Sequence, residues 1–331
     1  MKRDFLTIFD LSSEELERIL QRTGFLKAHR EQGRRGAKEQ GNKGAVPPPP
    51  CPSVPLPFRP LEGKTVGLIF RKPSTRTRVS FEVGILDLGG HSLFLSSSEL
   101  QLGRGESVKD SARVLSRYLD GLVIRTFAHE ELEEWARYAT IPVVNGLSDL
   151  YHPCQILADL FTIQEHRGTY RGVQVAYVGD GNNVAHSWLA AAGKLGFHLA
   201  IASPPGYQPR EEVVIRALEL AQKSGSSIEI LQDPVQAVRG ADVIYTDVWA
   251  SMGQEAEEAQ RLQAFQGYQV NRRLVEEAQK PAYILHCLPA HRGQEITDEV
   301  LEGESSLVLD QAENRLHVQK AILEWLIGEP C

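Results

Sequence analysis

The sequence contains few sulfur-bearing residues, with four cysteines and two methionines among 331 residues. The cysteines, Cys51, Cys154, Cys287 and Cys331, are widely spaced and form no Cys-x-x-Cys pair. Disulfide frameworks and the common zinc and dithiol motifs need cysteines at close, paired spacings. The pattern excludes such frameworks, favours a reducing compartment, and gives no reason to expect a bound metal.

Long apolar runs and an excess of positive charge are also lacking. No stretch approaches the roughly 18 apolar residues that a membrane span requires. The 36 basic residues are outnumbered by 43 acidic ones, for a net charge of -7, so the chain lacks the basic footprint that nucleic acids and anionic membranes demand. The first residues carry no apolar signal core. We therefore expect a cytoplasmic protein with neither a nucleic-acid nor a membrane partner.

The length exceeds what one hydrophobic core usually serves, and the composition is that of a globular protein, with 42% hydrophobic and 24% charged residues. We predict a first domain over residues 1–150 and a second over 151–309, entered through a helix that begins near His152. Residues 310–331 are predicted to form a helix that packs back on the first domain. Function is then expected in a cleft between the domains.

Residues 28–60 depart from the rest of the sequence because they are rich in Arg, Gly, Gln and Pro, with four consecutive prolines at 47–50. Such a composition disfavours regular structure. We predict a mobile surface insertion here. A proline-rich docking segment is the alternative.

Strand-like and helix-like segments alternate from Thr65 onward. Short apolar runs such as TVGLIF (65–70), GLVIRTF (121–127), VQVAYVG (173–179) and YILHCLP (283–289) are separated by amphipathic stretches. This alternation predicts an α/β fold with two doubly wound parallel sheets bridged by helices. Ligands of such sheets bind beyond the carboxyl ends of the strands.

The first apolar run, TVGLIF, leads into Ser74-Thr75-Arg76-Thr77-Arg78 and then into a predicted helix. Free backbone N–H groups, hydroxyls and guanidiniums at a helix N-terminus form an anion receptor, and arginine suits phosphate geometry. A capped helix with a solvated basic face is the alternative for this string taken alone.

The complete string Ser-Thr-Arg-Thr-Arg-Val-Ser-Phe-Glu resembles the carbamoyl phosphate signature of the aspartate/ornithine transcarbamylase family. Further strings of that family follow in order: Arg125-Thr126, His152-Pro153-Cys154-Gln155 and Glu313-Asn314-Arg315. The resemblance implies that Arg76, Arg125, His152 and Cys287 are catalytic. It implies carbamoyl phosphate contacts for Ser74, Thr75, Arg76, Thr77, Gln101, Arg125, His152, Gln155, Cys287, Leu288 and Arg315. Gln101 lies in a loop that in the family reaches a neighbouring subunit, which implies a homotrimer or a multiple of trimers with sites at subunit interfaces.

Two strings in the second half resemble the ornithine branch of the family, Asp247-Val248-Trp249-Ala250-Ser251-Met252-Gly253 and His286-Cys287-Leu288-Pro289. The resemblance implies that Asp247 pairs with the α-ammonium of ornithine, and that Ser251 and Met252 contact the same substrate. Asn183 would bind its carboxylate, with Asn182 as the possible substitute. Each residue alone would suggest only a turn cap or a packed side chain.

The implied reaction is transfer of the carbamoyl group from carbamoyl phosphate to the δ-amine of ornithine, giving citrulline and phosphate without a cofactor. The proton of the amine could go to the leaving phosphate or through Cys287. Within the class, putrescine or another amine is the alternative acceptor. A nicotinamide oxidoreductase is possible on fold alone, but Gly179-Asp180-Gly181 is followed by Val184 where a dinucleotide fingerprint needs a third glycine. A non-catalytic binding module and a role in arginine breakdown rather than synthesis also remain open.

Overall fold

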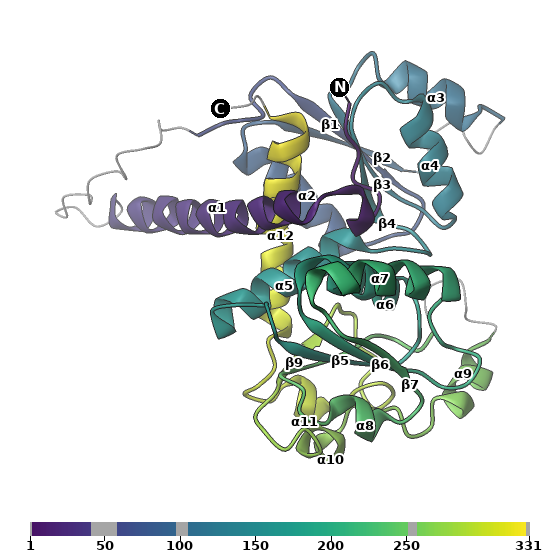
Figure 1. Cartoon of the computed structure of the whole chain (residues 1–331). Helices are drawn as coiled ribbons and strands as arrows, with labels where there is room; N and C mark the ends of the chain where they lie inside the picture. The colour runs from purple at the N-terminus through teal and green to yellow at the C-terminus, as the bar shows by residue number, and fades with distance from the viewer. Residues whose placement is uncertain (1, 41–57, 97–104, 251–256, 329–331) are drawn as a thin grey trace.

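The computed structural model describes residues 2–40, 58–96, 105–250 and 257–328, which fold into two lobes, each built on a parallel sheet (Figure 1). The first sheet has the strand order β2-β1-β3-β4 and the second the order β7-β6-β5-β8-β9. The strands are β1 (Thr65–Phe70), β2 (His91–Ser96), β3 (Gly121–Arg125), β4 (Val143–Leu147), β5 (Gln174–Val178), β6 (His198–Ala202), β7 (Ile228–Leu231), β8 (Val243–Thr246) and β9 (Tyr283–His286). The predicted fold class is confirmed.

The central strands read as continuous apolar runs because helices cover both faces of each sheet. The helices of the first lobe are α1 (Ser13–Gln40), α2 (Thr75–Asp87), α3 (Val108–Leu115) and α4 (His129–Tyr138), preceded by the 3-10 helix η1 (Ile8–Asp10). Those of the second lobe are α6 (Asn183–Leu195), α7 (Glu211–Ser224), α8 (Pro234–Val238), α9 (Glu258–Ala264), α10 (Arg272–Glu276) and α11 (Asp298–Leu301). In the described parts of the chain, no helix is long and apolar enough to cross a bilayer.

Two helices join the lobes, α5 (Pro153–Arg167) and α12 (Val308–Ile327). As predicted, α5 follows the N-cap residue His152 and carries proline in its first turn. It is buried over its first three turns, from Pro153 to Ile163, and the polar side chains among them, Gln155, Asp159 and Thr162, are hydrogen-bonded. Figure 1 shows α12, in yellow, running from the lower lobe into the upper one, where it packs against α1 and α2. The division of the chain at residue 150 stays a prediction.

The predicted mobile insertion over residues 28–60 was wrong for residues 28–40, because α1 continues to Gln40. A tertiary contact stabilises this extension, because Arg30 pairs with Asp87 at 3.1 Å, and Lys27 just before it pairs with Glu165 at 2.8 Å. Good helix formers among residues 28–40 also outweigh its two glycines. Residues 41–57, which hold the proline run, lie outside the described part of the chain.

The strand order of each sheet reverses once, and the candidate site lies at these two reversal points. In the first sheet the chain leaves β1 for β2 on one side and returns to β3 on the other, so the first reversal lies between β1 and β3. In the second, β6 and β7 lie on one side of β5, and β8 and β9 on the other. Loops diverge at such points and leave a crevice outside the carboxyl ends of the strands. The two crevices face each other across the lobes.

Candidate active site

A cleft of about 1040 Å³ is lined by residues from both crevices. The predicted site residues among them are Ser74, Arg76, Arg125, His152, Asn183, Asp247, Cys287, Leu288 and Arg315. Nine side chains from distant parts of the sequence therefore meet at one surface.

Three predicted residues, Thr75, Thr77 and Gln155, do not line the cleft. Thr75 is exposed, whereas Thr77 and Gln155 are fully buried. Their contacts with a ligand stay predictions. Gln101, Ser251 and Met252 lie outside the described residues, so their predicted roles stay predictions as well.

The first wall of the cleft is the N-terminus of α2. The Ser74 hydroxyl accepts a hydrogen bond from the Thr77 backbone N–H at 3.3 Å, which starts the helix and leaves the other first-turn N–H groups free. Arg76 lines the cleft in this turn, whereas the Arg78 Nε donates to Glu82 at 2.9 Å. The helix therefore presents free N–H groups and one guanidinium to the cleft.

Two further guanidiniums lie beside Arg76. Arg125 ends β3, where it pairs in register with Phe70, the last residue of β1. Arg315 lies about two turns inside α12, which begins at Val308. Arg125 and Arg315 are buried, and the Nε atom of each has no hydrogen-bond partner.

Burial, together with the charges of Arg315 and Arg76, lowers the pKa of Arg125 to about 10. Burial and then the charges of Arg315, Arg125 and Arg76 hold the pKa of His152 well below its usual value. The imidazole is therefore neutral, and its buried Nδ1 has no partner. The three guanidiniums are held close together despite their mutual repulsion, and the Nε donors of two of them have no partner. Such a cluster is suited to bind an anion.

The second wall is formed where β5, β8 and β9 end side by side. Thr246 of β8 pairs in register with His286 of β9, which places Asp247 beside Cys287. The Cys287 thiol donates to Asp247 Oδ1 at 2.9 Å, and the Asn182 amide donates to Asp247 Oδ2 at 2.8 Å. A buried carboxylate thus lies opposite the cationic wall and is suited to bind an ammonium group.

The adjacent residues Asn182 and Asn183 differ in their hydrogen-bond partners. The Asn182 side chain caps α6 by accepting from the N–H groups of Val184 and Ala185, so it is occupied by the fold. The Asn183 amide donates to the Ser148 carbonyl oxygen at 2.6 Å and lines the cleft. Asn183 is thus the residue of the pair whose carbonyl oxygen is not engaged in capping.

Cys287 is held as a thiol. Burial, and then the adjacent Asp247 carboxylate, raise the pKa of Cys287 well above its usual value. We expect iodoacetamide at pH 8 to alkylate Cys287 at least about tenfold more slowly than N-acetylcysteine, because the thiolate is the reactive form. Site-resolved peptide mass spectrometry over time measures this rate. Alkylation as fast as that of the free amino acid would contradict the protonated state.

The Asp247, His286 and Cys287 ligand atoms lie within 4.8 Å of one another, close enough for a metal ion. Each is already engaged, however. His286 Nδ1 accepts from the Leu288 N–H at 2.8 Å, which leaves its Nε2–H to donate to Glu295 at 3.0 Å. These bonds hold the turn after β9, in which Leu288 has a φ of 56°, a conformation that is strained for a non-glycine residue. The cluster fits a role in shaping this turn better than one in binding a metal.

Several cleft residues were missed at the level of sequence. Lys72 lies in the cleft beside Asp149, and its Nζ is 4.2 Å from the Phe127 ring centre. His186 donates from Nδ1 to the Leu150 carbonyl and accepts at Nε2 from the Arg210 N–H, both at 3.0 Å. Burial lowers the pKa of His186 to about 4, so this bridge keeps a neutral ring. Lys72 could have been predicted from the sequence, because it lies two residues before Ser74, the first residue of the anion-binding string.

Arg261 was also missed, and no motif marks it. Its guanidinium donates to Asp180 at 3.0 Å and to the Trp249 carbonyl at 2.9 Å, which ties the end of β5 to the loop after β8. Burial raises the pKa of Asp180 to about 6 even though Arg261 opposes the shift.

The glycine turn after β5 is packed by the chain itself. Gly181 donates its N–H to the Tyr207 carbonyl at 2.8 Å, and a Cβ at this position would lie 2.1 Å from the backbone nitrogen of Pro209. The close approach that glycine permits is thus used by residues 207–209, where a dinucleotide would place its pyrophosphate.

We expect Gly181→Ala to lower the free energy of unfolding by about 2–3 kcal/mol, because backbone must move to admit the methyl group. Gly24→Ala is the matched control, since Gly24 lies within α1 and a Cβ there would contact only the Phe161 side chain of α5, at 3.6 Å. That change should leave stability unchanged or raise it by about 0.5–1 kcal/mol. Urea unfolding followed by circular dichroism compares the two, and equal midpoints would refute the packing argument.

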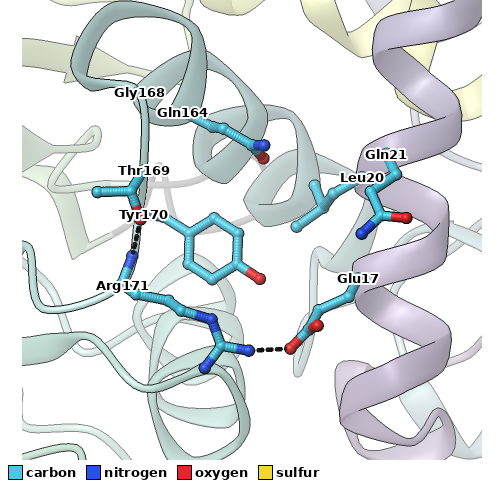
Figure 2. Close-up of a pocket in the computed structure, with 8 residues that line it drawn as sticks. All are labelled: Glu17, Leu20, Gln21, Gln164, Gly168, Thr169, Tyr170 and Arg171. Atoms are coloured by element: carbon cyan, nitrogen blue, oxygen red, sulfur yellow. Dashed lines mark hydrogen bonds and ion pairs between the residues drawn. The ribbon is translucent and has the colours of Figure 1, made fainter.

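A second hollow lies apart from these residues. Figure 2 shows it between α1 and the turn after α5, with Tyr170 and Leu20 inside and the Glu17–Arg171 ion pair at one side. Its volume is about 170 Å³, and it shares no lining residue with the cleft. It carries no group of catalytic side chains.

Residues 3–165 match the family described as "Aspartate/ornithine carbamoyltransferase, carbamoyl-P binding domain", and residues 171–326 match "Aspartate/ornithine carbamoyltransferase, Asp/Orn binding domain". The chain is 53% identical to the ornithine carbamoyltransferase of Syntrophus aciditrophicus (strain SB) over 327 residues, which covers 99% of this chain and 100% of that one. It is 51% identical to the anabolic ornithine carbamoyltransferase of Pyrococcus furiosus over 98% of this chain and 96% of that one. A solved structure of ornithine carbamoyltransferase from Pyrococcus furiosus superimposes with a TM-score of 0.88 at 51% identity, covering 99% of this chain and 98% of that one.

Proposed function

Because the chain belongs to the aspartate/ornithine carbamoyltransferase family, we propose that it transfers the carbamoyl group of carbamoyl phosphate to the δ-amine of L-ornithine, giving L-citrulline and phosphate. One observation of the structure carries the proposal. Three guanidiniums and a helix N-terminus face a buried carboxylate across one cleft, so an anion and an amino acid can be held against each other.

On the anion side, Arg76 and the free N–H groups of α2 bind the phosphate group. Arg125 and His152 hold the carbamoyl oxygen, and Arg315 supports the same end of the substrate. The neutral His152 ring can donate one hydrogen bond without adding a fourth positive charge. On the other side, Asp247 pairs with the α-ammonium of ornithine and Asn183 binds its carboxylate. Ser251 and Met252 complete the ornithine contacts in this proposal.

The δ-amine attacks in its neutral form, and its lone pair forms a bond to the carbamoyl carbon. The oxygen of the tetrahedral intermediate gains negative charge, which Arg125 stabilises; one donor of this kind is typically worth about 3 kcal/mol. Collapse breaks the bond between the carbamoyl carbon and the phosphate oxygen, and Arg76 meets the leaving charge. The raised pKa of Cys287 disfavours its thiolate as the base, which supports the departing phosphate as acceptor of the amine proton.

The acceptor is tested by supplying carbamoyl phosphate with ornithine, putrescine or N-acetylornithine and measuring the ureido product. We expect ornithine to be preferred over N-acetylornithine by about 10⁴-fold or more in kcat/KM, because acetylation removes the α-ammonium group and leaves the charge of Asp247 without its partner. Putrescine should also be a poorer acceptor, because it lacks the carboxylate that Asn183 binds in this proposal. Equal turnover of putrescine would move the protein to another acceptor. Failure of all three would refute the proposed reaction.

We further propose that the chain acts as a homotrimer in the cytoplasm, in arginine biosynthesis. Strand β2 is an edge strand, and beside it α2 exposes Val79 and Leu86, with Leu86 71% accessible. Exposed apolar side chains on a helix beside an edge strand favour burial against another subunit.

Among the described cysteines, Cys154 and Cys287 are free thiols, which suits a reducing compartment. The relative from Pyrococcus furiosus is named anabolic, which supports the biosynthetic direction. Sedimentation equilibrium should give three times the mass of one chain, and a monomer would contradict the trimer.

A further inference from the structure

A carboxyl group buried behind the cleft takes no part in the steps above. Asp159 lies on α5 with no exposed surface. Its Oδ1 accepts one hydrogen bond from Gln155 Nε2 at 2.8 Å and another from Gln311 Nε2 at 2.7 Å. Its Oδ2 has no partner. Two primary amides thus meet at one oxygen atom.

On the anion side, this contact fixes which way the Gln155 amide points. Because Nε2 donates to Asp159, Oε1 faces Arg315 and accepts from its guanidinium at 3.0 Å. The other end of the same guanidinium donates to Thr77 Oγ1 at 2.9 Å, beside the N-terminus of α2. A flipped Gln155 amide would set its N–H groups against those of Arg315 and lose both bonds.

On the ornithine side, the same logic applies to Gln311. Its Nε2 donates to Asp159, so its Oε1 accepts from the His286 backbone N–H at 3.0 Å. His286 ends β9, and the next residue, Cys287, donates to Asp247. The orientation of one amide therefore fixes the strand end that carries the second wall of the cleft.

We propose that Asp159 is a positioning residue that orients the Gln155 and Gln311 amides and thereby couples Arg315 on the anion side to the Cys287 turn on the ornithine side. The inference rests on the proposed function, because both walls must be held at once for two substrates to react. No other described carboxyl group lies between these two glutamines.

Opposing effects act on the pKa of Asp159. Burial raises its pKa to about 7, while the hydrogen bonds from Gln155 and Gln311, the nearby Tyr245 hydroxyl and the charge of Arg315 oppose the shift. The titratable groups that face it are Arg315 on α12, Tyr245 on β8 and Cys287 after β9. Both protonation states keep Oδ1 as an acceptor, since a proton can reside on Oδ2. Asparagine can therefore reproduce the neutral form.

The test compares Asp159→Asn with Asp159→Leu in citrulline-forming assays of the full-length protein. We expect Asp159→Leu to lower kcat/KM for both substrates by about 100-fold, because loss of about 1 Å in positioning is worth that much. Asp159→Asn should stay within about threefold of the unmodified protein, because its carbonyl oxygen still accepts from both glutamines. Thr162→Val is the matched control: Thr162 lies on the same helix, accepts from Asn314 on α12, and touches neither glutamine. It should lower the melting temperature without changing either KM.

The outcomes separate the two proposals. An inactive unmodified protein refutes the reaction itself. An active protein whose Asp159→Leu variant keeps both KM values and kcat overturns the positioning role, and so does an Asp159→Asn variant as impaired as the leucine one. If Asp159→Leu does not fold, Gln311→Leu removes the same link from the α12 side and should raise the KM for ornithine at least about tenfold. An unchanged KM there would also overturn the inference.

The burial of the carboxyl group gives a readout that does not depend on activity. An acid whose pKa rises on folding binds more protons in the native state than in the unfolded state at pH values between its two pKa values. Native stability therefore falls as the pH rises from about 4 to about 7, and Asp159→Asn escapes this loss. We expect the melting temperature of Asp159→Asn, relative to the unmodified protein, to increase between pH 5 and pH 8. A difference that does not change with pH would contradict the raised pKa of Asp159, whereas the positioning role is decided by the kinetic comparison above.

Discussion

Arg76→Ala is expected to lower kcat/KM for carbamoyl phosphate by about 10³-fold, the usual loss when one donor to a developing charge is removed. Arg76 lines the cleft at the first turn of α2 and is the least buried of the three clustered guanidiniums. Its charge helps to lower the pKa values of Arg125 and His152, so the cluster is held together against repulsion. Removal of one charge should therefore leave the melting temperature unchanged or raise it. Steady-state kinetics and thermal unfolding of the same preparation measure both effects.

Arg78→Ala is the matched control for this prediction, because it removes a guanidinium two positions away on the same helix. The Arg78 side chain pairs with Glu82 at 2.9 Å and lies 3.7 Å from the Phe94 ring centre, outside the cleft. We expect it to lose at most about threefold in kcat/KM, as for an exposed ion pair. Equal losses in both variants would show that the general basicity of the helix, and not the position of Arg76, supports the reaction.

Asp247→Asn is expected to lower kcat/KM for ornithine by about 10³-fold, because a buried charge pair that loses one partner weakens by several kcal/mol. The asparagine keeps the size of the side chain and one acceptor for Asn182 or Cys287, so the fold should survive. The KM for carbamoyl phosphate should change little, since that substrate binds at the opposite wall. N-acetylornithine lacks the α-ammonium group, so any slow reaction with N-acetylornithine should be nearly unaffected.

Asp242→Asn provides the control on the same strand. Asp242 lies just before β8, at the end opposite Asp247, where it accepts from Lys280 at 2.6 Å and from the Gln174 N–H at 2.9 Å. Its loss should destabilise the fold by about 1–3 kcal/mol without changing the KM for ornithine. A similar rise in this KM for both variants would argue that Asp247 acts only through stability.

The sequence predicted the strands β1, β3, β5 and β9 because each is a short, continuous apolar run between amphipathic stretches. It did not predict the full length of α1, whose last turns contain Gly33 and Gly36 and whose stability comes from contacts such as Arg30–Asp87. The short helices α9, α10 and α11 were also missed. Helices of one or two turns carry too few residues for a period to emerge, and tertiary packing decides them.

The site was predictable where a motif follows a strand, as at Arg125, Asp247 and Cys287, since a strand end in a parallel sheet fixes where the next side chain lies. It was not predictable where the direction of a side chain depends on partners far along the chain. Gln155 and Thr77 face Arg315 behind the cleft, and this follows only from the packing of α12. Arg261 shares no local pattern with Asp180, although their side chains meet at 3.0 Å.

The path of α12 has a consequence for biosynthesis on the ribosome. Every other described element is made before it, yet α12 covers α1 and α2, and Glu324 receives two hydrogen bonds from Arg22 at 2.8 and 2.7 Å. A nascent chain that has not passed Val308 leaves those apolar faces open to water, so the first lobe cannot complete its core while translation continues. The N-terminal half therefore waits for the last-made helix, and a premature stop before residue 308 would produce a chain prone to aggregation instead of a smaller functional enzyme.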